Sequence, residues 1–322
     1  MFRKYRRKII FSIIFGAIVY IALSAYANFG ELSSALSSYS WLMLPVILIL
    51  SLCNYLSRFF KWEYYIGILG ISLERKLSLV IFLSSFIMSV TPGKIGEVFK
   101  SYLLKEYNGT PVSRSAPIVI AERITDFLSL VLLSITGALM LGYGRLIIAL
   151  VGAFFVLLII ILSSKKLCHA ILELFMKIKF ISRFSSRVYT AYDSIYQMVR
   201  IKELLVAIGL SIIAWTFECL AFWMIVNGFG IENFMHIDIF VATFIYGFST
   251  LIGAVTMLPG GLGATDASMT GLLVLIQIPK NIAVASTIII RTATLWFAVI
   301  VGIVSVIIYE KMYKKIPHTT IK

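Results

Sequence analysis

Charged side chains inside long apolar runs are the residues of this chain most suited to chemistry. Glu122, Arg123 and Asp126 lie in "APIVIAERITDFLSL", Glu218 lies in "WTFECLAFW", and Arg291 lies in "STIIIRTATLWF". An ionisable group in hydrocarbon costs about 2.5–3.5 kcal/mol, so it is rarely placed there without a partner or a cavity. These runs therefore predict either buried ion pairs or a polar site inside a membrane.

Arg291 is the strongest of these signals, because long apolar stretches flank it on both sides. Asp266, Glu218 and Asp126 are the acidic partners that we consider for it. The alternative for every such group is an internal ion pair that fixes helix packing, or a charge at the membrane surface. For residues 122–123, which lie near the predicted inner surface, that alternative explains the sequence as well as a ligand site does.

Two Pro-Gly breaks interrupt apolar segments: "SVTPGKIGEVFKSYLL" at residues 89–104 and "LPGGLG" at residues 258–263. Glycine permits a ligand to approach the backbone closely, and the free N–H groups of a broken helix suit an anion. Lys94 and Lys100 add positive charge at the first break, whereas Glu97 could simply cap a hairpin end. The breaks and the buried charges together predict a cavity for a headgroup that bears phosphate. Nearby acids would pair with the cations when the cavity is empty, or meet a cationic part of the substrate.

The candidate residues for substrate binding or translocation either form a break or carry charge beside an apolar run. They are Pro92, Gly93, Lys94, Gly96, Glu97, Lys100, Glu122, Arg123, Asp126, Glu218, Pro259, Gly260, Gly261, Gly263, Asp266 and Arg291. We assign no catalytic residue, no metal ligand and no cofactor, because the three cysteines and three histidines are scattered along the chain. The stretch "PGKIGE" lacks the spacing and the Ser or Thr of a P-loop.

Membrane helices must position these residues, since the chain of 322 residues is 60% hydrophobic with a mean hydropathy of +0.97. Helices are the only open-chain structure that satisfies backbone groups in lipid. We therefore predict an all-α polytopic membrane protein with about six full spans, at residues 9–28, 40–60, 116–141, 146–162, 204–228 and 282–309. The two interrupted regions, 78–104 and 238–279, are predicted to form re-entrant hairpins, because the apolar run before the first break is too short to span.

Basic residues set the predicted orientation. The N-terminal arm, residues 75–76, the segment 163–203 and the C-terminal tail carry many Lys and Arg residues, which places both termini on the cytoplasmic side of the cell membrane. This pattern requires each interrupted region to return to its starting side, as two hairpins or two pairs of complete crossings would do. Hairpins from opposite sides would form an inverted repeat, which the shared Pro-Gly-x-(Ile/Leu)-Gly pattern favours.

The net charge of +14 does not predict nucleic-acid binding, because the basic residues cluster between and beyond the spans. We expect one transmembrane domain over residues 1–322, with a homo-oligomer left open. The basic segment 163–203 is predicted to lie on the inner leaflet as amphipathic helices, or to form a solvated hairpin. The first apolar run is as long as a span and is interpreted as a retained helix rather than a cleaved signal.

Three stretches, "TPGKIGEVFKSYLL", "APIVIAERITDFLSL" and "LPGGLGATDASMTGLL", resemble the signature stretches of the lysylphosphatidylglycerol synthase transmembrane-region family, also called the flippase-like domain family. The resemblance runs through essentially the whole chain. It implies a helical membrane domain with re-entrant elements, which in two-part bacterial members moves aminoacylated phosphatidylglycerol across the bilayer. Lys100 stands where the family usually has Arg, and Asp266 stands where Glu is common.

The function that we predict is a lipid transporter, a flippase or scramblase. Its substrate would be an anionic phospholipid, an aminoacylated phospholipid or a lipid-linked phosphate, and its partners would be membrane lipids with phosphate headgroups. One alternative is a membrane-embedded transferase that acts on a lipid phosphate, and another is a non-catalytic subunit of an envelope complex. The aminoacyl-transferase domain of the two-part members does not appear in these 322 residues, so a lysyltransferase activity is not expected.

Overall fold

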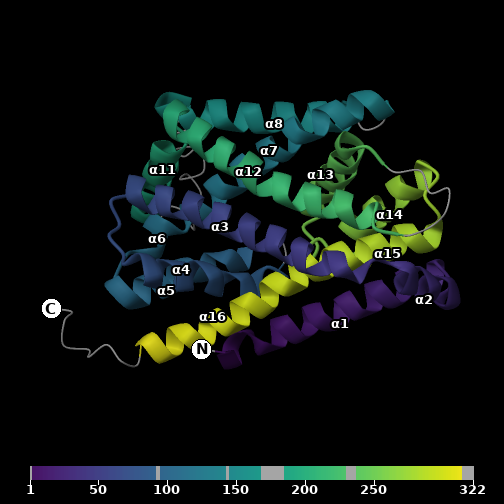
Figure 1. The fold of residues 1–322 in the computed structure, drawn as a ribbon. Helices are drawn as coiled ribbons and strands as arrows, with labels where there is room; N and C mark the ends of the chain where they lie inside the picture. The colour runs from purple at the N-terminus through teal and green to yellow at the C-terminus, as the bar shows by residue number, and fades with distance from the viewer. Residues whose placement is uncertain (1, 92–94, 143–144, 168–184, 230–236, 314–322) are drawn as a thin grey trace.

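The computed structural model describes residues 2–91, 95–142, 145–167, 185–229 and 237–313, and Figure 1 shows the chain as a bundle of helices. Within these ranges the secondary structure is helical, apart from one isolated bridge between Tyr39 and Phe229. The predicted all-α polytopic membrane class is therefore confirmed. The single-domain prediction stays a prediction, and residues 168–184 of the basic segment lie outside the described residues, although α11 (Ser185–Met198) belongs to it.

Long apolar helices form at all six predicted spans. They are α1 (Phe2–Tyr26), α3 (Leu44–Ile68), α7 (Pro117–Leu141), α8 (Arg145–Ser163), α12 (Ile201–Val226) and the continuous run of α15 (Lys280–Arg291), η4 (Thr292–Trp296) and α16 (Phe297–Tyr313). Four helical stretches in the described part are long and apolar enough to cross a membrane on their own: Trp41–Ile68, which includes η1 (Trp41–Met43), Val112–Leu141, which includes α6 (Val112–Ser115), Ile201–Val226 and Lys280–Met312.

The segment between the first two predicted spans, for which no helix was predicted, forms the helix α2 (Phe29–Ser38). Asn28 caps this helix by accepting a hydrogen bond from Gly30 N at 3.1 Å, which explains why a helix restarts here. The axes of α1 and α2 meet at 95°, so together they make one candidate span that is bent at its end.

Both interrupted regions fold back on themselves. The first contains α4 (Arg75–Ser84) and η2 (Ser85–Met88), then the break, then η3 (Ile95–Val98) and α5 (Phe99–Asn108). The second contains α13 (Ile239–Val255) and α14 (Ala264–Leu275) on either side of its break. In each, the helix after the break packs against the helix before it, as re-entrant hairpins require.

The two hairpins enter from opposite ends of the bundle. Figure 1 shows α4 and α5 at the end where α1 begins and α16 finishes, which we name the terminus face. The helices α14 and α2 lie at the other end, which we name the opposite face. A hairpin from each face is the arrangement found in transporters built from inverted repeats.

The two halves of the chain share one element order and one pattern of contacts. Long helix, short helix, long helix, hairpin and long helix occur as α1, α2, α3, α4–α5 and α7, and again as α8, α11, α12, α13–α14 and α15–α16. Between the halves, α3 packs on its counterpart α12. The contact of α4 with α16 corresponds to the contact of α13 with α7, and the contact of α2 with α15 corresponds to that of α11 with α7. Each of these contacts between the halves thus has an equivalent when the two halves are exchanged.

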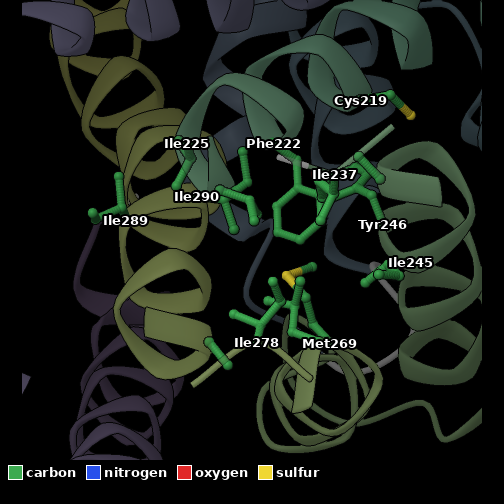
Figure 2. Close-up of a cluster of buried hydrophobic side chains, with 14 of the residues drawn as sticks. Cys219, Phe222, Ile225, Ile237, Ile245, Tyr246, Met269, Ile278, Ile289 and Ile290 are labelled. Atoms are coloured by element: carbon green, nitrogen blue, oxygen red, sulfur yellow. The ribbon is translucent and has the colours of Figure 1, made fainter. Parts of the chain in front are cut away.

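Glycines let each hairpin approach a long helix closely. A Cβ at Gly137 of α7 would overlap the carbonyl oxygen of Phe240 in α13, and a Cβ at Gly302 of α16 would overlap the backbone nitrogen of Ile87 in η2. Apolar packing adds to this at the second hairpin. Figure 2 shows the ring of Phe222 from α12 at the centre of a buried cluster that includes Met269 of α14 and residues of α13 and α15.

Candidate functional site

A cavity of about 280 Å³ lies where the second hairpin break meets the long helices α7, α12 and α15. A smaller cavity of about 60 Å³ adjoins it and reaches the first hairpin. The two share Trp215, Thr250, Gly260 and Arg291 as lining residues. Residues from both halves of the chain therefore surround two adjoining cavities.

Arg291 is bound to the second hairpin by two contacts. Its Nε lies 2.9 Å from Asp266 Oδ1, and its Nη2 donates a hydrogen bond to the carbonyl oxygen of Gly260 at 2.5 Å. The other carboxylate oxygen of Asp266 accepts a hydrogen bond from Gly263 N at 2.8 Å, which caps α14. Of the three acids considered as partners of Arg291, the structure therefore pairs it with Asp266.

The backbone of the second break can pass close to its neighbours because of its glycines. Gly260, Gly261 and Gly263 have φ of 60°, 68° and 84°, in the left-handed region that side chains disfavour. A Cβ at Gly260 would lie 3.4 Å from the Cα of Val90, just before the first break. The second break thus contacts the chain just before the first break.

Asp126 is the centre of a second charged group. Its Oδ1 accepts a hydrogen bond from Lys61 Nζ at 2.6 Å, and its Oδ2 lies 3.3 Å from Arg123 Nη2 and 3.6 Å from Arg58 Nη2. Arg123 Nη2 also donates to Glu97 Oε2 on the first hairpin at 3.0 Å. The long helices α3 and α7 and the first hairpin therefore meet through these ion pairs.

Sequence reasoning missed Arg58 and Lys61, although both are in the chain at "SRFFKWEYY". Arg58 falls inside the predicted span 40–60 and Lys61 directly follows it, so both resembled charges at a span end. Because α3 continues to Ile68, both lie within the helix, and Lys61 is only 1% exposed. The cost of a charge in hydrocarbon, applied to the longer helix, would have identified them.

Lys100 and Glu122, two of the predicted site residues, lie away from the cavity. Lys100 Nζ is 2.6 Å from Glu122 Oε2 and 4.7 Å from the ring centroid of Trp62, and both charged side chains are buried. Trp62 and Lys100 form a cation–π contact, which is favourable when desolvated. The ion pair of Lys100 and Glu122 joins α5 to α7 outside the cavity.

The remaining predicted residues divide by position. Those that line the two cavities are Glu97, Arg123, Asp126, Glu218, Gly260, Gly261 and Arg291. Asp266 pairs with Arg291 and accepts a hydrogen bond from Gly263 N, and Pro259 belongs to the same break. Gly96 N donates a hydrogen bond to Thr91 Oγ1 at 2.9 Å beside the first break. Pro92, Gly93 and Lys94 lie outside the described residues.

Two arginines line the larger cavity, and each contacts a carboxylate. Arg123 Nη2 lies 3.0 Å from Glu97 Oε2, and Arg291 Nε lies 2.9 Å from Asp266 Oδ1. The planar guanidinium group matches phosphate oxygens in a bidentate geometry.

Opposite these charges, the larger cavity is apolar and reaches the surface. Its wall includes Phe127, Leu130 and Ala254, and it ends at Met257 and Leu258, which are 65% and 37% exposed. An amphipathic cavity with an apolar mouth can hold a charged headgroup while an attached chain stays in the surrounding lipid.

The helix that carries Arg291 is irregular directly after it. The π-helical segment η4 follows, and Tyr55 OH donates to the carbonyl oxygen of Thr294 at 2.7 Å. Short π segments occur frequently at functional sites. In the smaller cavity, Tyr246 OH donates to Glu218 Oε2 at 2.5 Å, so a tyrosine that sequence reasoning did not identify also belongs to the site.

The described residues contain no group of three or more His, Cys, Asp or Glu side chains placed to hold a metal ion. The chemistry that the arrangement offers is anion binding by arginine, with carboxylates that can exchange places with the anion.

Known proteins match this sequence over almost the whole chain. A family model described as "Lysylphosphatidylglycerol synthase TM region" matches residues 9–302. A UPF0104 membrane protein of Methanocaldococcus jannaschii is 24% identical over 321 residues, covering 92% of this chain and 93% of that protein. A UPF0104 membrane protein of Methanothermobacter thermautotrophicus is 24% identical over 319 residues, covering 91% and 93%.

Proposed function

This multi-pass membrane protein belongs to the lysylphosphatidylglycerol synthase TM region family, and from that premise we propose that it moves a lipid with a phosphate headgroup across the bilayer. The two linked cavities bind the headgroup, and the lipid tails remain outside the apolar mouth. The substrates that fit are an anionic phospholipid, an aminoacylated phospholipid or a lipid-linked phosphate. The membrane in which it acts would be the cell membrane, with both termini in the cytoplasm.

One observation carries this proposal: two arginines, Arg291 buried and Arg123 partly buried, share a cavity whose other wall is apolar. Charge alone would be consistent with internal ion pairs, since each arginine also contacts a carboxylate. The apolar wall and mouth of the cavity favour the lipid site, because ion pairs that served only packing would need no apolar opening beside them.

In the mechanism that we propose, phosphate oxygens replace carboxylate oxygens at the arginines. Glu97 and Asp266 hold Arg123 and Arg291 in the empty cavity. When the headgroup binds, these acids release the arginines, and one half of the chain then moves against the other, as in transporters built from inverted repeats. A gradient, or consumption of the lipid on one side, would set the direction of net transport.

The proposal is tested by reconstitution into vesicles of phosphatidylcholine and phosphatidylglycerol with a trace of fluorescent phosphatidylglycerol. Transport is followed as access of the fluorophore to an external reducing agent. We expect the wild type to exceed protein-free vesicles. Arg291→Gln should lower the rate at least about tenfold, because a charge-assisted hydrogen bond contributes about 1.5–3 kcal/mol.

Arg145→Gln is the matched control, since Arg145 is exposed at the start of α8 and bonds only to carbonyls of α7. It should transport at the wild-type rate. If the wild type moves neither phosphatidylglycerol nor any other phosphate-bearing lipid above background, the proposed function is wrong.

A further inference from the structure

We propose that the cavity contains two equivalent phosphate subsites, one for each membrane face, and that the headgroup passes from one to the other. Arg123 with Glu97 forms the subsite of the terminus face, and Arg291 with Asp266 forms the subsite of the opposite face. This inference rests on the proposed function and specifies how its site is built.

Both subsites have the same construction. In each half, the acid lies just after a hairpin break and the arginine lies on the long helix that follows. Arg123 comes 26 residues after Glu97, and Arg291 comes 25 residues after Asp266. The contact distances are alike as well, at 3.0 Å for the first pair and 2.9 Å for the second. Counted from the proline of each break, the acids correspond to within two residues and the arginines to within one.

The helices that carry the two arginines begin at opposite faces. The helix α7 begins at the terminus face, and Arg123 is six residues after Pro117, or about 9 Å along the axis. The helix α15 begins at the opposite face, and Arg291 is eleven residues after Lys280, or about 17 Å along the axis. Each arginine therefore lies on a helix that begins at the face where its own hairpin enters.

Both arginines line the larger cavity, and each contacts one carboxylate. A carboxylate occupies part of each guanidinium group, so Glu97 and Asp266 act as internal substitutes for the phosphate. A headgroup that leaves one arginine can bind the other without leaving the cavity.

The experiment measures affinity separately for each face. The protein is reconstituted into phosphatidylcholine vesicles in one orientation, which is verified by protease cleavage of an N-terminal tag, and a second preparation has the reverse orientation. Phosphatidylglycerol is then added to the outer leaflet by cyclodextrin exchange, and the initial transport rate is measured against its mole fraction. A passive carrier must have the same ratio of maximal rate to half-saturating mole fraction in both directions, so the informative quantity is the half-saturating mole fraction at each face.

We expect Arg123→Gln to raise the half-saturating mole fraction about tenfold for access from the terminus face and little for the opposite face. Arg291→Gln should show the reverse, and Arg145→Gln should change neither. Arg123→Lys and Arg291→Lys, which keep the charge, should restore part of the affinity at the same face as the corresponding Gln variant.

Equal shifts at both faces for both arginines would show a single shared site and overturn the two-subsite proposal while leaving lipid transport intact. Absence of transport by the wild type would instead contradict the proposed function, and the subsites with it.

Discussion

At the scale of single residues, Asp126 connects the charged network. It is 3% exposed and contacts Lys61, Arg58 and Arg123, two of which come from another helix. Ser211 Oγ of α12 also accepts a hydrogen bond from Lys61 Nζ at 2.7 Å. The carboxylate thus balances cations from α3 and α7 in a region with little access to water.

Replacing Asp126 by Asn should therefore destabilise the protein strongly. The Lys61 ammonium would remain buried without its counter-charge, and breaking a buried pair by removing one partner costs about 3–5 kcal/mol. Reversible unfolding in mixed micelles would measure this loss. The double variant Lys61→Met/Asp126→Asn should recover a large part of it, because the uncompensated charge is gone. Equal stability of the single and double variants would show that the ion pair is not what holds these helices.

The sequence located the charged residues but not their partners. Arg291 stood out because its flanks are apolar, yet three acids were compatible with it, since the distance between side chains on separate helices depends on the packing of the hairpins. Lys100 and Glu122 were expected in the site because each is a charge beside an apolar run. In the structure they pair with each other outside the two cavities. Arg58 and Lys61 were missed because the predicted end of their span was too early.

At the scale of elements, each hairpin packs unusually close to a long helix. Gly137 and Gly302 occupy corresponding interfaces in the two halves, and each faces backbone atoms of a hairpin rather than flexible side chains. A backbone cannot move aside as a side-chain tip does, so these positions admit no Cβ without displacing the hairpin.

Gly137→Ala and Gly302→Ala should each lower the free energy of unfolding by about 1–3 kcal/mol, the usual cost of overpacking. Gly209→Ala in α12 is the matched control, because a Cβ there meets nothing within 4 Å. It should be neutral or slightly stabilising, since Ala is the better helix former. Thermal unfolding in one detergent would compare the three. A control that loses as much as Gly137→Ala would refute the proposed role of close packing.

The elements themselves were largely predictable. Span length and apolar content mark the long helices, and each Pro-Gly break marks a hairpin turn. The helix α2 was missed because its ten residues include small polar ones and look like a loop in a hydropathy pattern. Its start depends on the Asn28 cap, a local signal that a search for spans does not use.

At the scale of the whole molecule, the exchange symmetry of contacts is the feature that the sequence indicated least. A five-residue pattern was shared by the two breaks, but the pairing of α4 with α16 and of α13 with α7 appears only in the fold. This symmetry brings two hairpins from opposite faces to one cavity. In the mechanism that we propose, a movement of one half against the other would open that cavity to either side.

The most direct test of this account asks whether the cavity is the transport path. Thr250 lines both the larger and the smaller cavity. In a variant whose native cysteines are replaced by alanine, Thr250→Cys is labelled with a bulky thiol reagent, and lipid transport is measured before and after labelling in the same vesicles. Ile213→Cys, which is 51% exposed on α12, is the matched control. We predict that labelling at residue 250 abolishes transport and that labelling at residue 213 leaves it unchanged. Undiminished transport after complete labelling at residue 250 would contradict the account.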